Sequence, residues 1–112
     1  MFIEEQIIHS EILALVNRQI KCNWREVKVT FLTDGEVTST FDSSYTNIDT
    51  NEELELNIGF ELFQPFYKLR RDMIESKLSA WFTATYILSS SGGYTFQYDD
   101  TPFNIFEHGL ST

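Results

Sequence analysis

Residues 24–35 read WREVKVTFLTDG, and this stretch decides the fold. Val27, Val29 and Phe31 alternate with charged or polar residues, which places the apolar side chains on one face of a strand. Asp34-Gly35 follows at once and favours a two-residue hairpin turn, because the central residues of such turns need positive φ. We therefore expect a half-buried strand, a tight turn, and a second strand over about residues 36–45.

The segment before this strand predicts an amphipathic helix over about residues 3–21. Its apolar residues recur at helical spacing, with polar residues between them: Ile3, Ile7, Ile8, Ile12, Leu15, Val16 and Ile20. Acids stand near its start and Arg18 and Lys21 near its end, as the helix dipole favours.

Two periodicities overlap in residues 46–79. Strict alternation of Leu54, Leu56, Ile58, Phe60 and Leu62 indicates a strand, whereas Ile58, Leu62, Phe66, Leu69 and Met73 have helical spacing. Thr50 with Glu53 would form a capping box that opens a helix early, and Pro65 fits only the first turn of a helix. We favour a strand over about 53–60 and a helix over about 62–79. The alternative is one long helix kinked at Pro65.

The last third of the chain predicts a closing hairpin. Residues 81–88 alternate as a strand, Ser90 to Gly93 form a turn, and Tyr94, Phe96 and Tyr98 continue as a paired strand. Pro102 ends that strand, and we expect the aromatic tail at 103–106 to dock. The predicted fold is α+β in one domain over residues 1–112. An antiparallel sheet of about four to five strands carries the N-terminal helix and a second, central helix on one face.

Composition excludes several classes of function. The chain has 112 residues, enough for one domain, and Leu, Ile, Val and Phe make up about 30% of it, enough for a core. Its net charge of −9 repels nucleic acids and anionic membranes. The single Cys22 cannot form an internal disulfide, and the start of the chain, MFIEE, lacks the basic region of a secretory signal. We expect a cytoplasmic protein that contacts neither membrane nor nucleic acid directly.

Catalytic and cofactor motifs are not evident in the sequence. His9 and His108 are the only imidazoles, and neither Cys22 nor any serine lies in a recognised nucleophile motif. One cysteine and two distant histidines cannot supply a zinc site, and Gly92-Gly93 lacks the frame of a phosphate-binding loop. We therefore predict no enzyme, no metal and no cofactor. A hydrolase that uses His9 or His108 is the least favoured alternative.

Charge is distributed unevenly along the chain. Residues 29–67 contain eight acids and no Lys or Arg, and residues 78–112 contain Asp99, Asp100 and Glu107 without a base. Both segments are rich in Tyr and Phe. An anionic surface with aromatic anchors suits capture of a basic protein, because charge speeds encounter and aromatic rings supply binding energy. The simpler explanation is a solvated acidic face that keeps the protein soluble.

The C-terminal half resembles the YezG-like antitoxin and immunity family. The motifs that carry this likeness are Trp81, Leu88, Gly92-Gly93, Phe96 and Tyr98-Asp99-Asp100, in that order. The resemblance implies a protein that does no chemistry. It would bind and neutralise a cognate toxin domain, often a nuclease, in bacterial polymorphic toxin or contact-dependent inhibition systems. A nuclease must have a basic substrate site, which an acidic inhibitor can cover by mimicking phosphate charge.

We accordingly expect a one-to-one complex with a basic toxin domain. The expected toxin-binding residues are Tyr98, Asp99, Asp100 and Glu107, with Asp42, Glu53 and Glu55 as secondary contacts. Asp99-Asp100 has an alternative explanation as the end of a strand. The rival function is a small-ligand or subunit-assembly module, in which the aromatic excess lines a cavity or the face of a homo-oligomer.

Overall fold

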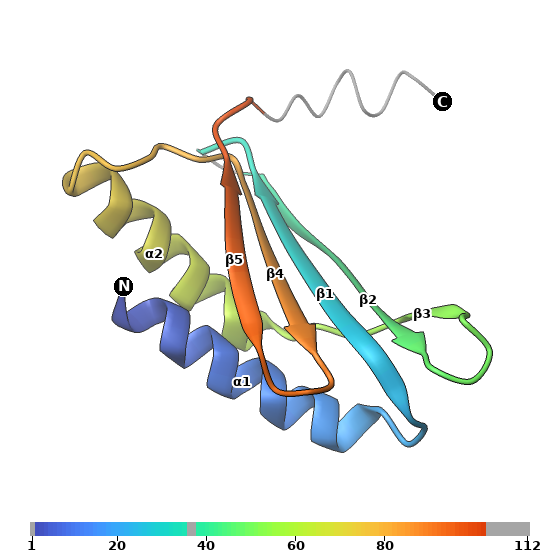
Figure 1. Ribbon diagram of the computed structural model, residues 1–112. Helices are drawn as coiled ribbons and strands as arrows, with labels where there is room; N and C mark the ends of the chain where they lie inside the picture. Colours follow the sequence, from blue (N-terminus) through green and yellow to red (C-terminus); the bar gives the residue numbers. More distant parts are fainter. Residues whose placement is uncertain (1, 36–37, 103–112) are drawn as a thin grey trace, which may run out of the picture.

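The computed structural model describes residues 2–35 and 38–102 and has the predicted α+β fold. Five antiparallel strands form one sheet in the order β3-β2-β1-β4-β5. Both helices lie on the same face of this sheet (Figure 1). In chain order the elements are α1 (Ile3–Gln19), β1 (Trp24–Thr33), β2 (Ser39–Asn47), β3 (Glu53–Glu55), the 3-10 helix η1 (Phe60–Leu62), α2 (Phe63–Glu75), β4 (Thr83–Ser89) and β5 (Tyr94–Asp99).

Strand β1 is the centre of the sheet, as its alternation predicts. Val27, Val29 and Phe31 are fully buried beneath the helices, whereas Lys28 between them is exposed. The ring of Phe31 stacks on Phe66 of α2, with their centroids 5.0 Å apart. Burying such rings supplies much of the stability of a small domain.

Helix α1 buries a different stripe from the one expected. Ile8, Ile12 and Leu15 are buried, but Ile3 is 66% and Ile7 44% exposed. Each residue turns the helix by about 100°, so the stripe that contains Ile8 and Ile12 continues to Glu4 and not to Ile3 or Ile7. The sequence prediction that all seven apolar residues share the buried face is therefore wrong for the first two.

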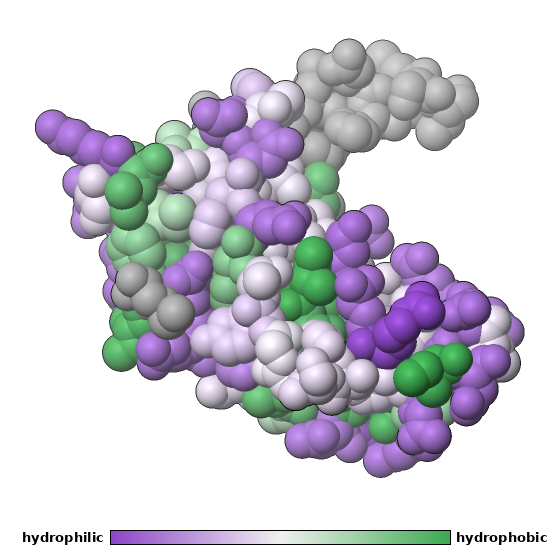
Figure 2. Space-filling model, in the orientation of Figure 1, coloured by the Kyte–Doolittle hydropathy of each residue, from purple (hydrophilic) through white to green (hydrophobic). Residues whose placement is uncertain are grey.

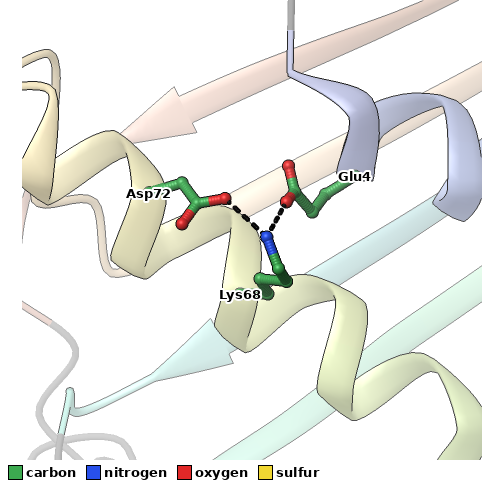
Figure 3. Close-up of polar contacts among 3 residues, drawn as sticks. All are labelled: Glu4, Lys68 and Asp72. Carbon is green, nitrogen blue, oxygen red and sulfur yellow. Dashed lines mark hydrogen bonds and ion pairs between the residues drawn. The ribbon is translucent and has the colours of Figure 1, made fainter.

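Glu4 is tolerated in the interface between the helices because it is paired. Its carboxylate, only 2% exposed, accepts a hydrogen bond from Lys68 Nζ at 2.5 Å, and the same ammonium donates to Asp72 at 2.9 Å (Figure 3). These hydrogen bonds, the one to Glu4 first, raise the pKa of Lys68, and the bond from Lys68 lowers the pKa of Asp72. The triad joins the start of α1 to the middle of α2.

The region with two periodicities resolves into a short strand and a helix. Strand β3 contains only Glu53–Glu55, not residues 53–60, because the chain must leave the sheet edge to reach the helical layer. Leu56, 2% exposed, begins that crossing by turning into the core. Helix α2 begins at Phe63, which places Pro65 in its first turn as predicted. One long kinked helix is excluded.

The connection between β1 and β2 is longer than the predicted two-residue turn. The strand pairing ends at Thr33 and Ser39, and the amide of Asp34 donates to the carbonyl of Thr38 at 3.0 Å. The carboxylate of Asp34 in turn accepts from the amide of Thr38. Only Gly35 of the predicted pair has positive φ, +84°. The predicted docking of the tail at 103–106 lies outside the described residues.

Candidate protein-binding surface

The face of the sheet opposite the helices is not covered by any described helix (Figure 1). Because side chains alternate along a strand, the strand pairing identifies the residues that share this face. We call it the open face, and it consists of Glu53 and Glu55 of β3, Thr40, Asp42, Ser44 and Thr46 of β2, Glu26, Lys28, Thr30 and Leu32 of β1, Thr83, Thr85, Ile87 and Ser89 of β4, and Thr95, Gln97 and Asp99 of β5.

Three of the predicted toxin-binding residues come together at one corner of the open face. Asp42 of β2 and Glu53 and Glu55 of β3 line a hollow of about 510 Å³, and we call these residues the acidic corner. Figure 2 shows hydrophilic side chains gathering at this β2–β3 end of the molecule. No Lys or Arg is among the described residues that line the hollow. The carboxylates therefore face solvent without a lining cation to neutralise them.

The hollow exists because β3 is short. Strand β3 pairs only with the segment Ser44–Thr46, so no strand among the described residues lies beside the part of β2 that precedes Ser44. Phe41, Leu54 and Ile58 contribute apolar surface to the same hollow. The site thus combines a rim of carboxylates with an apolar lining, which fits a long basic side chain whose stem is apolar and whose tip is charged.

The other predicted acids lie at the opposite edge of the sheet. Asp99 and Asp100 line a separate hollow of about 440 Å³ with residues of β4 and β5. Asp42 is three strand spacings from β5, roughly 14 Å, so the two acidic groups do not form one site. Glu107 lies outside the described residues.

Asp99 also has a structural role at the end of β5. Its Oδ1 accepts a hydrogen bond from the backbone amide of Thr101 at 2.8 Å. This bond lowers the pKa of the Asp99 carboxyl, because it favours the charged form. The arrangement is that of a turn after a strand, which agrees with the alternative explanation of Asp99-Asp100 as a strand end.

The side chain of Tyr98 points to the helical side of the sheet and not to the open face. Its hydroxyl donates to Glu5 of α1 at 2.6 Å, and its ring lies 5.7 Å from that of Trp81. Burial, followed by the hydrogen bond to Glu5, raises the pKa of Tyr98. Tyr98 therefore tethers β5 to the start of α1.

Two open-face residues that the sequence analysis did not single out contribute charge. Lys28 lies at the centre of the face, two strands from Glu55 in the same row of paired residues, and Glu26 lies beside it on β1. The alternation of β1 placed both residues on the exposed side, which is the signal that could have identified them. Lys28 separates the acidic corner from the acids at β5.

His9 is part of the packing between α1 and the sheet. Its Nδ1 lies 2.6 Å from the hydroxyl of the fully buried Tyr86, and its ring stacks on Tyr94 with centroids 3.7 Å apart. Desolvation lowers the pKa of His9. The only imidazole in the described chain thus forms a hydrogen bond with a buried hydroxyl. Cys22 is exposed. His108 lies outside the described residues.

Residues 2–35 and 38–102 contain neither a candidate metal centre nor a helix that could span a membrane. No group of three or more His, Cys, Asp or Glu side chains in these residues could hold a metal ion. None of the described helices has the length and apolar character needed to cross a bilayer.

Comparison with known proteins finds no matching family model and no matching curated protein. The resemblance to the YezG-like family therefore rests on the sequence motifs alone.

Proposed function

We propose that this protein is an immunity protein that binds and neutralises a basic toxin domain through its open face. The observation that carries the proposal is the acidic corner, where Asp42, Glu53 and Glu55 line one hollow without a lining cation. A surface built in this way attracts a cationic partner and holds a basic side chain.

Electrostatic attraction would raise the association rate with a basic partner and discriminate against anionic ones. A net charge of −9 steers a positively charged domain toward the protein and repels nucleic acid. If the toxin is a nuclease, its substrate site is basic, and carboxylates at the acidic corner would occupy the positions of substrate phosphates. Inhibition of this kind needs no chemistry from the immunity protein.

An arginine of the toxin would fit the acidic corner best. Its guanidinium forms paired hydrogen bonds with carboxylates, and its stem packs on apolar surface such as that of Phe41 and Leu54. Asp99 and Asp100 would meet a second part of the toxin in a one-to-one complex. A cytoplasmic location suits this role because nuclease substrates are there, and Cys22 is a free thiol.

The test is to express this protein together with the toxin domain encoded beside its gene, and to measure growth rescue and binding by calorimetry. The wild type should rescue growth. Charge reversal in the double variant Asp42→Lys/Glu55→Lys should weaken binding by at least tenfold and abolish rescue, because it places ammonium groups against basic side chains.

The matched control is a charge reversal of the same size on α1 and α2, Glu11→Lys/Glu75→Lys, at two exposed acids away from the open face. It changes net charge equally, so it separates a local site from general attraction. Equal weakening by both double variants would reject the acidic corner as the site. A neighbouring gene that encodes no toxin, or a toxin that this protein does not bind, would reject the function.

A further inference from the structure

The outer edge of β5 has a row of backbone groups without strand partners among residues 2–35 and 38–102. Ser89 donates to the carbonyl of Gly93, and Phe82 to that of Asp99, both at 2.8 Å. In an antiparallel pair, backbone groups point alternately toward and away from the neighbouring strand. The amides and carbonyls of Tyr94, Phe96 and Tyr98 therefore point away from β4. Within the part of the chain that the structure describes, no hydrogen bond satisfies them.

The two edges of the sheet differ in how they are protected. Strand β3 has three residues, two of which are Glu53 and Glu55, and short charged strands discourage pairing with another chain. Strand β5 has six residues, and the segment from Tyr94 to Tyr98 contains no charge and no proline. An edge of that length and composition is a template for another strand.

We propose that a second copy of this chain pairs with the β5 edge, so that one continuous sheet runs through a symmetric dimer. The two β5 strands would lie antiparallel about a two-fold axis at Phe96. Tyr94 would face the partner's Tyr98, and Phe96 the partner's Phe96. The outward backbone groups would then form about six hydrogen bonds across the interface.

The charges of β5 are compatible with this register. Asp99, the only charged residue of the strand, would lie opposite the partner's Gly93, and the two Asp99 residues would be roughly 20 Å apart. That separation exceeds the Debye length of about 8 Å at physiological salt. Moving the axis to Tyr98 would bring Pro102, which lacks an amide hydrogen, opposite the partner's Tyr94 and lose a hydrogen bond.

Side chains on both faces also match in this register. Tyr94, Phe96 and Tyr98 are half-buried on the helical side, and each would gain an aromatic neighbour across the new interface. On the open face the exposed Thr95 would face the partner's Gln97. The acidic corner of each copy would remain at the far end of the sheet, so the dimer does not depend on the proposed function.

The experiment is sedimentation equilibrium of the full chain from about 5 to 300 µM, a range in which a small interface reveals itself by mass action. The wild type should be dimeric at the upper concentrations. In the double variant Thr95→Glu/Gln97→Glu, acids face acids across the axis, and the dimer should dissociate at least tenfold more readily. In Thr95→Lys/Gln97→Glu opposite charges face each other, which should restore or strengthen the dimer.

The control Asn17→Glu/Thr40→Glu adds the same charge at exposed positions of α1 and β2 and should remain dimeric. Far-UV circular dichroism of each variant checks that the fold is retained. A wild type that is monomeric at about 300 µM would overturn the proposal. If the control variant were monomeric, or if the opposite-charge variant failed to dimerise, the proposed register would be wrong, and with it the assignment of the β5 edge as the interface.

Discussion

A substitution at His9 can remove the hydrogen bond to Tyr86 and still leave an aromatic ring at that position. In the variant His9→Phe, an aromatic ring still stacks on Tyr94, but no ring nitrogen remains to form the hydrogen bond with the Tyr86 hydroxyl. Burial raises the pKa of Tyr86, so the hydroxyl keeps its proton, and the His9 tautomer decides which of the two groups donates. The variant leaves a polar group unsatisfied in a residue that is 0% exposed.

The cost of an unsatisfied buried polar group is about 1–3 kcal/mol, so we expect His9→Phe to lower the free energy of unfolding by about 2 kcal/mol. For a domain of this size that loss corresponds to a fall in Tm of roughly 8 °C. Tyr86→Phe should be milder, about 1 kcal/mol, because the partly exposed imidazole can bond to water instead. The double variant should be more stable than His9→Phe alone.

Urea unfolding followed by circular dichroism measures these differences. Acidification adds an independent check, because desolvation lowers the pKa of His9 below its ordinary value of 6.5. Below pH 6.5 the unfolded chain binds more protons than the folded one, so the wild type loses stability and its advantage over His9→Phe shrinks. A single variant as stable as the wild type, or an advantage that grows on acidification, would refute the reasoning.

Three further predictions concern stability and are checked by the same unfolding measurements. Lys68→Met should destabilise the fold more than Glu4→Leu, because only the former leaves a buried carboxylate without its cation; equal effects would contradict this. Gly92→Ala should cost about 1 kcal/mol because φ is +101° at Gly92, whereas Gly93→Ala in the same turn should be nearly neutral; similar losses would show that the backbone conformation is not the cause. The wild type should be more stable than Asp99→Asn at neutral pH, and because the folded pKa is depressed, this advantage should disappear as pH falls below 3.8; a pH-independent difference would count against it.

The architecture could be predicted where one periodicity dominates a segment. Strand β1 alternates from Glu26 to Phe31, and over that stretch the apolar residues Val27, Val29 and Phe31 are buried and the polar residues between them are not. The prediction failed for α1 because Ile3 and Ile7 are as apolar as the residues that are buried, so composition could not reveal which stripe faces the sheet. That choice depends on Lys68, which is distant in sequence and makes burial of Glu4 possible.

The length of β3 also depends on tertiary structure. Leu54, Leu56 and Ile58 alternate with polar residues as in a strand, yet only Leu54 lies in β3. Strand β2 pairs with just three residues of this segment before the chain crosses to α2. The position at which β3 ends also determines where the acidic corner lies. The sequence identifies the acidic residues. Only the strand order shows that Asp42 lies beside Glu53 and Glu55, whereas Asp99 lies at the other edge of the sheet.

In the part of the chain that the structure describes, helices cover only one side of the sheet, and this separates the residues that maintain the fold from those that are free to vary. Side chains on the uncovered side stand above the backbone and do not reach the layer between sheet and helices, so substituting them changes stability by little, typically within about 0.5 kcal/mol. Residues on that side could therefore diverge one at a time during evolution while the scaffold stays constant.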